Sequence, residues 1–278
     1  MSGPQNGSAR PTANGAGLNE LEVLCRELQA KVDSFLDKPT EDEVLNSVKN
    51  QIIVARGVID EALRRYRPEE LSLSYNGGKD CLVLLILILA SLPTSVSLQQ
   101  SSAQSSSCSP RPFPRRLQAL YIRPPLPFAE VDEFVATTSA IYHLDLTTSN
   151  QPMKPALTTY LRERPEVKAV FVGTRRTDPH GADLTFFDQT DADWPRFMRI
   201  HPVIDWHYRE VWGFIRALGI PYCPLYDKGY TSLGGTDDTH PNPALKGGKG
   251  SNSDTNEQQF RPAYELMEDR EERLGRDR

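Results

Sequence analysis

Apolar residues recur every three or four positions near the start of the chain. This spacing predicts two amphipathic helices, over residues 18–37 and 41–66. In the second helix Val48, Ile52 and Ile59 fall on one face. Thr40 precedes a run of acidic residues and is the expected N-cap, and Pro68 follows the expected end. The folded part of the chain is therefore expected to begin with a helical pair.

Beyond Pro68 the pattern alternates between short apolar runs and amphipathic segments. Strands are expected at 71–75, 117–122, 145–148, 167–173 and 197–204, and helices at 81–92, 128–144, 153–164 and 207–218. Some strands, such as 167–173, are apolar on both faces, which is typical of a parallel sheet covered on both sides. The predicted fold class is α/β: a mostly parallel, twisted sheet with helices on both faces, extra N-terminal helices and a C-terminal arm.

Three segments interrupt the pattern. Residues 1–17 hold mainly Gly, Pro, Ser, Asn and Ala and are expected to form a disordered tail. Segments 95–116 and 246–259 are polar and of low complexity, and are expected to be mobile surface inserts. Residues 18–278 therefore read as a single domain. By composition alone, the charge-dense C-terminal segment resembles a solvated helix with i,i+4 charge pairs.

Charge and cysteine content exclude several classes of protein. The 278 residues carry a net charge of −5 with a pI near 5.6, which argues against a general nucleic-acid binder. The four cysteines show no C-x-x-C pair, so a zinc site is not expected. The apolar run 81–92 is too short to span a bilayer, and the N-terminus lacks an apolar signal region. We expect a cytoplasmic monomer without membrane or nucleic-acid partners.

The stretch "SYNGGKD", residues 74–80, carries more chemistry than a turn requires. It follows an expected strand and opens an expected helix, where ligands of parallel sheets bind. Glycines let backbone N–H groups converge on a ligand, and a helix N-terminus favours phosphate. The stretch fits neither the Walker A pattern nor G-x-G-x-x-G. Cys81 is expected to be a small packing residue in the first helical turn.

A second polar cluster, "FVGTRRTDPHGADL" at 171–184, follows the apolar strand 167–173. Arg175 and Arg176 offer guanidinium groups that match phosphate oxygens, and Asp178 lies two residues further on. Among the aromatic residues, Trp212 is expected in the core. Trp194 and Trp206 are each expected either to pack in the core or to line a flat aromatic ligand. The histidines His201 and His207 lack metal-ligand spacing and are expected to be structural or surface residues.

"SYNGGKD" resembles the PP-loop, S-x-G-G-x-D, of the ATP pyrophosphatase superfamily. The Asn before Gly-Gly-Lys-Asp-Cys resembles one branch, the eukaryotic FAD synthetases, whose fold is PAPS-reductase-like (adenine nucleotide alpha hydrolase-like). Further motifs of that branch occur in the same order at 173–181, 191–195, 202–206, 225–234 and 241–245, followed by "PAYELMEDREERLGR" near the end. The resemblance spans roughly residues 40 to 278, apart from the two inserts.

The resemblance implies an FMN adenylyltransferase: ATP and FMN are the substrates, FAD is a product, and Mg²⁺ is the cofactor, held mainly by substrate phosphates with Asp80 as a possible ligand. It implies catalytic roles for Asn76, Asp80, Asp178, Arg273 and Arg276. The two arginines are expected to fold back onto the nucleotide phosphates. The expected ligand-binding residues are Ser74, Tyr75, Gly77, Gly78, Lys79, Tyr121, Ile122, Arg123, Gly173, Arg175, Arg176, Asp191, Trp194 and Trp206.

The phosphate loop is expected to bind the phosphates of ATP. The backbone of the strand end 121–123 is expected to contact the adenine of ATP. Asp178 and the 191–194 region are expected at the flavin. Other readings stay open: another PP-loop adenylyltransferase, a PAPS-reductase-like enzyme, or a non-catalytic nucleotide-sensing module. A sulfate reductase would need a C-terminal cysteine, and no cysteine follows Cys223. A tRNA-thiolating enzyme would need paired cysteines and a basic surface.

Overall fold

A six-stranded sheet forms the centre of the molecule. The computed structural model describes residues 19–103, 113–247 and 259–277, so the expected tail, residues 104–112 of the first insert and residues 248–258 of the second lie outside the described residues. The strand order is β3-β2-β1-β4-β6-β5. The strands are β1 (Leu71–Ser74), β2 (Leu117–Ile122), β3 (Leu144–Ser149), β4 (Ala169–Phe171), β5 (Phe187–Gln189) and β6 (Met198–Ile200). Neighbours pair in parallel up to β6, which confirms the predicted mostly parallel α/β sheet.

The far edge of the sheet differs from the prediction. β5 pairs antiparallel with β6 and was not expected, because three residues are too few to show an alternating pattern. β6 itself ends at Ile200, although strand was expected to 204. Val203 and Ile204 are apolar because they pack in the core from a turn, not because they extend the strand.

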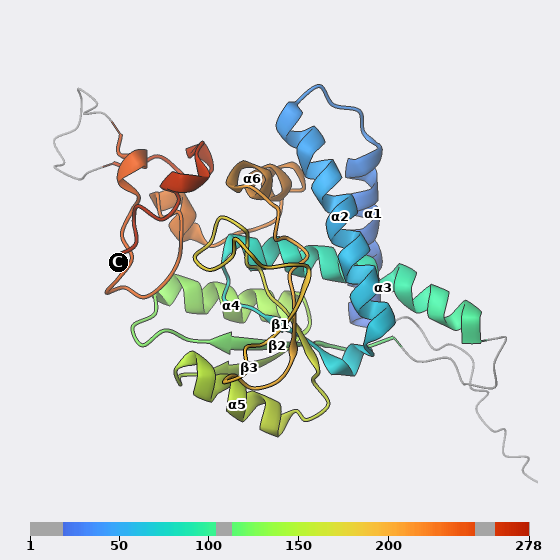
Figure 1. Ribbon diagram of the computed structural model, residues 1–278. Coiled ribbons are helices and arrows are strands. Elements are labelled where there is room, and N and C mark those ends of the chain that lie inside the picture. The colour runs from blue at the N-terminus through green and yellow to red at the C-terminus, as the bar shows by residue number, and fades with distance from the viewer. Residues whose placement is uncertain (1–18, 104–112, 248–258, 278) are drawn as a thin grey trace, which may run out of the picture.

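Helices cover both faces of the sheet, as predicted (Figure 1). They are α1 (Glu20–Asp37), α2 (Glu43–Arg65), α3 (Lys79–Ala103), α4 (Ala129–Ile141), α5 (Met153–Glu163) and α6 (Tyr208–Ala217). Figure 1 shows α4 on one side of β2 and β3 and α5 on the other. The α1–α2 hairpin packs against α3, and α6 packs against α2 and α3. The extra N-terminal helices therefore thicken one layer of the domain.

The start of α2 lies two residues later than expected. Asp42, not Thr40, is the N-cap: its Oδ1 accepts hydrogen bonds from the backbone N–H groups of Val44 and Leu45 at 2.8 and 3.1 Å. Thr40 Oγ1 instead accepts from the N–H of Asp42 at 3.1 Å. The Asp42 carboxylate satisfies two backbone N–H groups that have no partner within the helix. Thr40 therefore lies before the N-cap and bonds to it from outside the helix.

α3 is longer than its apolar run suggests. It continues through Pro93 to Ala103, so residues 95–103 are helical and not part of a loop. The α1–α2 hairpin supports this extension: Gln29 donates to Thr94 Oγ1 at 2.6 Å, and Ser95 donates to Asp60 at 3.2 Å. Its segment Lys79–Ser97 is long and apolar enough to cross a membrane, but 72% of it is buried inside the protein. Core packing accounts for that hydrophobicity.

The C-terminal segment is an arm rather than a helix. It contains only short 3₁₀ turns at Ala263–Glu265 and Asp269–Glu271 among its described residues. Glu272 is buried, and the main chain near Gly275 bonds to His240 at 2.8 Å. The arm therefore finds its hydrogen-bond partners in the body of the protein, which composition could not reveal.

The strand order creates one crevice where a ligand can enter. From the central β1 the chain winds through β2 and β3 on one side, and through β4 and β6 on the other. The point between β1 and β4, where the winding changes direction, is where open α/β sheets bind ligands. The 74–80 loop leaves β1 there, and the 172–181 loop leaves β4 beside it.

Burial of α3 predicts a clear contrast between two isoleucines. Ile86 on α3 is 0% exposed, whereas Ile53 on α2 is 62% exposed. We expect Ile86→Ala to lower the free energy of unfolding by about 2–5 kcal/mol, because it leaves a cavity. Ile53→Ala, the same chemical change, should stay within about 0.5 kcal/mol. Urea titration of both variants measures this, and equal losses would contradict the assignment of α3 to the core.

Burial also makes His201, just after β6, sensitive to acid. It is 1% exposed, and desolvation lowers its pKa to about 4. The unfolded chain, with a His pKa near 6.5, binds a proton that the folded protein excludes, so stability falls as pH drops from about 6.5 to about 4. This group should cost roughly 3 kcal/mol across that window. His201→Asn should flatten this slope in unfolding titrations, whereas exposed His180→Asn should retain it.

Candidate active site

The loop between β1 and α3 is tightly built. Gly77 has φ +72°, and a Cβ there would lie 2.8 Å from Val135 Cγ2 on α4, so only glycine fits. Asn76 Oδ1 accepts a hydrogen bond from the Gly78 N–H at 3.0 Å and another from the Cys81 thiol at 2.9 Å. The start of α3 is thereby held close to the carboxyl end of β1, which is the geometry of an anion site.

A cleft of about 430 Å³ opens beside this loop. It is lined by the loop, the end of β2, the turn before α5 and the C-terminal arm. Its lining residues are Asn76, Tyr121, Ile122, Arg123, Pro124, Pro125, Pro127, Val131, Asn150, Gln151, Pro152, Met153, Leu233, Gly234 and Arg276. Five residues singled out from the sequence thus meet at one cleft: Asn76, the 121–123 strand end and Arg276.

The side chains at the end of β2 turn toward α4. Arg123 pairs with the Asp132 carboxylate, with Nε 2.9 Å from Oδ2, and the Tyr121 hydroxyl donates to Asp132 Oδ1 at 3.0 Å. Burial first, and Asp132 second, raise the pKa of Tyr121, so its phenol stays protonated. The side chains of Tyr121 and Arg123 therefore contact α4, and the adenine contact expected for the backbone of 121–123 stays a prediction.

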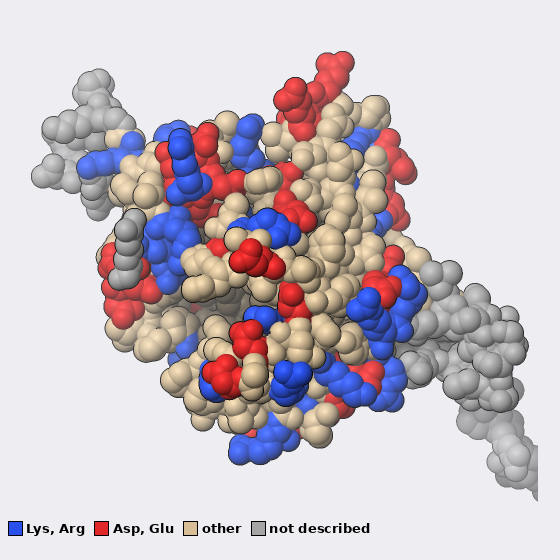
Figure 2. Space-filling model, viewed as in Figure 1, with Lys and Arg blue, Asp and Glu red and all other residues tan. Residues whose placement is uncertain are grey.

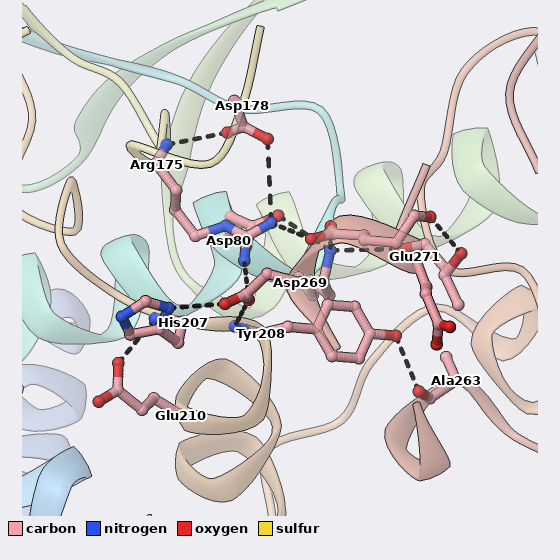
Figure 3. Close-up of polar contacts among 12 residues, drawn as sticks. Asp80, Arg175, Asp178, His207, Tyr208, Glu210, Ala263, Asp269 and Glu271 are labelled. Carbon is pink, nitrogen blue, oxygen red and sulfur yellow. Dashed lines mark hydrogen bonds and ion pairs between the residues drawn. The ribbon is translucent and has the colours of Figure 1, made fainter. Parts of the chain in front are cut away.

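Behind the loop lies a buried ionic cluster (Figure 3). Arg175, 0% exposed, places Nε 2.8 Å from Asp80 Oδ1, and its Nη2 bonds to Glu272. Lys79, 2% exposed at its side chain, bonds to Glu272 and lies 3.2 Å from Asp80 Oδ2. The pKa of Asp80 is lowered, because the attraction of Arg175 and Lys79 outweighs desolvation by burial, so this carboxylate is ionised.

This cluster corrects the roles expected for two cations. The side chains of Lys79 and Arg175 were expected on phosphates, but both face Asp80 and Glu272 instead. The Lys79 backbone N–H donates to the Tyr226 hydroxyl at 2.8 Å. The loop presents the amide of Asn76 to the cleft, while its lysine points the other way.

Asp178 belongs to the same cluster and Arg176 does not. Asp178 Oδ2 accepts from the Arg175 backbone N–H at 2.8 Å, and its Oδ1 is 3.8 Å from Arg175 Nη2. Arg176 points outward, pairs with Asp205 at 2.7 Å and donates to the carbonyl of Ala182 at 2.8 Å. Arg176 therefore braces its own loop in this structure, which departs from the phosphate role expected for it.

The described residues offer no ready-made site for Mg²⁺. They contain no group of three or more His, Cys, Asp or Glu side chains placed to hold a metal ion. Asp80, the possible additional ligand, already faces two cations, Arg175 and Lys79. A metal ion there would meet strong repulsion. Asp80 therefore does not fit a metal-ligand role in this arrangement.

The expected flavin residues are not all in one place. Trp206 is 1% exposed and packs edge-on against Phe214, so the core alternative holds for it, as it does for Trp212. Tyr75 is likewise buried, with its hydroxyl 2.8 Å from Thr138 Oγ1. Trp194 is half-buried near Lys154, the residue after the cleft-lining Met153. Trp194 thus packs beside α5, and its N–H donates to the carbonyl of the exposed Asp191 at 3.0 Å.

The loop after β4 is packed directly onto the start of α3. A Cβ on Gly173 would lie 2.9 Å from the backbone nitrogen of Cys81, so glycine permits this approach. Cys81 itself is buried, and burial raises the pKa of its thiol to about 12. It is a packing residue, as predicted, and not a reactive thiolate.

Several contributors were not anticipated. Glu272 pairs with both buried cations, Asp238 pairs with Arg276 at 2.7 Å, and Tyr226 binds the Lys79 N–H. Arg273 is exposed, and no ion pair joins it to another described residue. Of the two arm arginines expected at the phosphates, Arg276 reaches the cleft, and its neighbour Arg273 stays in solvent.

Several known proteins are similar to this chain over most of its length. Residues 70–241 match the phosphoadenosine phosphosulfate reductase domain family. A probable FAD synthase of Schizosaccharomyces pombe is 40% identical over 259 residues, which cover 93% of this chain and 89% of that protein. A probable FAD synthase of Caenorhabditis elegans is 34% identical over 223 residues, 80% of this chain but 39% of that longer protein.

The solved structures include a close match. The crystal structure of Candida glabrata FMN adenylyltransferase in complex with FAD and inorganic pyrophosphate superposes with a TM-score of 0.81 at 29% identity, over 95% of this chain and 99% of that one. Likeness in sequence and in fold extends over nearly the whole molecule. The chain belongs to the phosphoadenosine phosphosulfate reductase domain family and, within it, to the eukaryotic-type FAD synthetases.

Proposed function

We propose that this chain transfers AMP from ATP to the phosphate of FMN, giving FAD and pyrophosphate. The observation that carries this proposal is the cleft at the carboxyl ends of β1, β2 and β3, where Asn76 of the phosphate loop and Arg276 of the arm line the same space. An anion held there meets a helix N-terminus, an amide and a guanidinium. Two similar proteins, the S. pombe probable FAD synthase and the C. glabrata FMN adenylyltransferase, bear names that support the same reaction.

In the proposed reaction an FMN phosphate oxygen attacks the α-phosphorus of ATP. The new P–O bond forms as the bond from the α-phosphorus to the bridging oxygen breaks, and pyrophosphate carries away the electron pair. The phosphate nucleophile is already ionised near neutral pH, so no strong general base is required. Transfer then depends on positioning and charge neutralisation. This agrees with a cleft that holds Asn76 and Arg276 but no histidine among its lining residues.

We assign the leaving pyrophosphate to the backbone of Ser74, Gly77 and Gly78 with Asn76 and Arg276. Adenine is assigned to the backbone at 121–123. The flavin is assigned to the α5 side of the cleft, near Asp191 and Trp194, with Asp178 acting through the loop it shares with Arg175. Asp80 acts by holding Lys79 and Arg175 in place, which keeps α3 and the β4 loop together.

Mg²⁺ is proposed to arrive with ATP, bound by the phosphate oxygens that it prefers. It would supply charge neutralisation at the phosphates. Asp80 already faces Arg175 and Lys79, which supports this substrate-borne role.

We also propose a cytoplasmic monomer that binds small molecules and not nucleic acid. The cysteines Cys25, Cys81 and Cys223 are free and buried, which suits a reducing compartment. Figure 2 shows basic and acidic side chains interspersed over one face, without a continuous basic surface. Sedimentation of the purified chain tests the monomer, and a heavier species would contradict it.

The reaction is tested by mixing the purified protein with ATP, FMN and Mg²⁺. Chromatography should show FAD forming in the same amount as pyrophosphate, and chelation of Mg²⁺ should stop both. Nucleotide binding with unchanged FMN would overturn the proposal and favour a sensing module or another acceptor.

Asn76→Asp separates the structural and chemical roles of the loop amide. The new carboxylate keeps the acceptor for the Gly78 N–H, but it removes the amide donor and adds negative charge beside the phosphates. We expect FAD formation to fall by about 100-fold or more, with little change in melting temperature. Steady-state kinetics and thermal melts measure this. Unchanged turnover would remove Asn76 from the phosphate site.

Arg276→Ala tests the arginine that lines the cleft, and Arg270→Ala is its matched control on the same arm. The Arg270 side chain is 83% exposed, whereas that of Arg276 is 18% exposed and faces the cleft. We expect Arg276→Ala to lower kcat/KM by about 100-fold, through loss of a charge-assisted contact to phosphate. Arg270→Ala should keep its rate. Similar rates for the two variants would contradict the role of Arg276.

A further inference from the structure

Glu272 is the buried acidic side chain of the C-terminal arm. Its neighbours Arg270 and Arg273 face solvent, yet the side chain of Glu272 is 7% exposed. Its carboxylate bonds to Lys79 of the phosphate loop through one oxygen and to Arg175 of the β4 loop through the other. A single side chain of the arm thus ties together the two loops that flank the switch point.

The main chain at Glu272 is held as firmly as its side chain. The Glu272 carbonyl accepts from Thr231 Oγ1 at 2.6 Å and from Asn242 Nδ2 at 3.3 Å. Thr231 is 1% exposed and Asn242 is 0% exposed, so these bonds are shielded from water. The arm is therefore fixed in position at Glu272 by both charge and hydrogen bonding.

From this anchor the arm runs directly to the cleft. The Arg276 N–H bonds to the Arg273 carbonyl at 3.0 Å, so the chain makes one turn after Glu272. Arg276 then lines the cleft together with Asn76. Asn76 and Lys79 belong to the same loop, so Glu272 fixes the arm to the loop that Arg276 faces across the cleft.

We propose that Glu272 is a positioning residue for the adenylyl transfer: by binding Lys79 and Arg175 it sets the distance between the phosphate loop and Arg276. This rests on the proposed function. Glu272 acts through Arg276 and touches no substrate itself. It also keeps both buried cations occupied, so phosphate charge is met by Arg276 and the backbone of the loop.

Charge balance indicates that Glu272→Gln can fold. Arg175 and Lys79 lie within 4.0 Å of four carboxylates, those of Asp80, Asp178, Asp269 and Glu272. Removing one leaves three acids for two buried cations. Gln keeps the size of Glu and one of its two accepting oxygens, but its NH2 group cannot accept from the second cation, so the strong ionic anchor is lost.

A double-mutant cycle tests the proposal. Glu272→Gln should lower kcat for FAD formation by about tenfold or more, because small misplacement of a charged group is costly. In the Arg276→Ala background the same substitution should cost less than about twofold, since its effect passes through Arg276. Glu271→Gln, the neighbouring and partly exposed acid, is the matched control and should keep its rate.

The opposite pattern would overturn the proposal. An equal loss of kcat in both backgrounds means that Glu272 acts independently of Arg276, and an unchanged kcat means that it positions nothing. Should Glu272→Gln fail to fold, Thr231→Val removes the shorter of the two hydrogen bonds to the Glu272 carbonyl without altering charge and completes the same cycle.

Hydrogen exchange separates this proposal from the reaction. Glu272→Gln should speed exchange of the backbone amides in 271–277, but not those of β1 or the middle of α3. If the wild-type chain forms no FAD, the proposed function fails, and exchange then judges the anchor by itself. Faster exchange in the arm supports it, and unchanged exchange overturns it.

Discussion

The arrangement of the site depends on two buried cations, Lys79 and Arg175, which must be neutralised. Taking a charge out of water costs several kcal/mol unless an opposite charge compensates. Asp80 supplies a compensating charge from within the phosphate loop. Glu272 supplies another from the C-terminal arm, 193 residues after Lys79 in the chain. The pairing brings the loop after β1, the loop after β4 and the arm to one place, and the cleft lies at their margin.

Because of this pairing, the polar and charged residues around the phosphate loop fall into two groups. The buried charged residues behind the loop are structural, because each is balanced by a partner. The proposed function assigns phosphate to the backbone of the loop, Asn76 and Arg276; the last two line the cleft, and Arg276 also pairs with Asp238 there. Such a division suits nucleotidyl transfer, where fixed dipoles and one or two well-placed cations stabilise charge without needing to accept or donate a proton.

Much of the fold and part of the site could be predicted from local pattern. The parallel sheet, its crossover helices and the glycine turn are encoded by apolar periodicity and by residues with special backbone freedom. Asn76 and Arg276 were identified through motifs and do meet at the cleft. The predictions of local structure failed where the structure depends on contacts between residues distant in the sequence. The continuation of α3 beyond Pro93 became visible only when α1 and α2 packed beside it at Thr94 and Ser95, and Trp206 had two readings until its burial was known.

The sequence by itself determined the family, the α/β class, the phosphate loop and the identity of the groups available to bind an anion, because these follow from short-range pattern. Tertiary structure alone decided which cations line the cleft. Lys79 and Arg175 look no different from Arg276 in the sequence, yet the first two are buried against Asp80 and Glu272 and the third lines the cleft. The physical reason is that an ion pair forms between charges that folding brings together, however distant they are in the sequence. Because burying an unpaired charge is costly, each buried cation requires an acidic partner, which can come from any part of the chain.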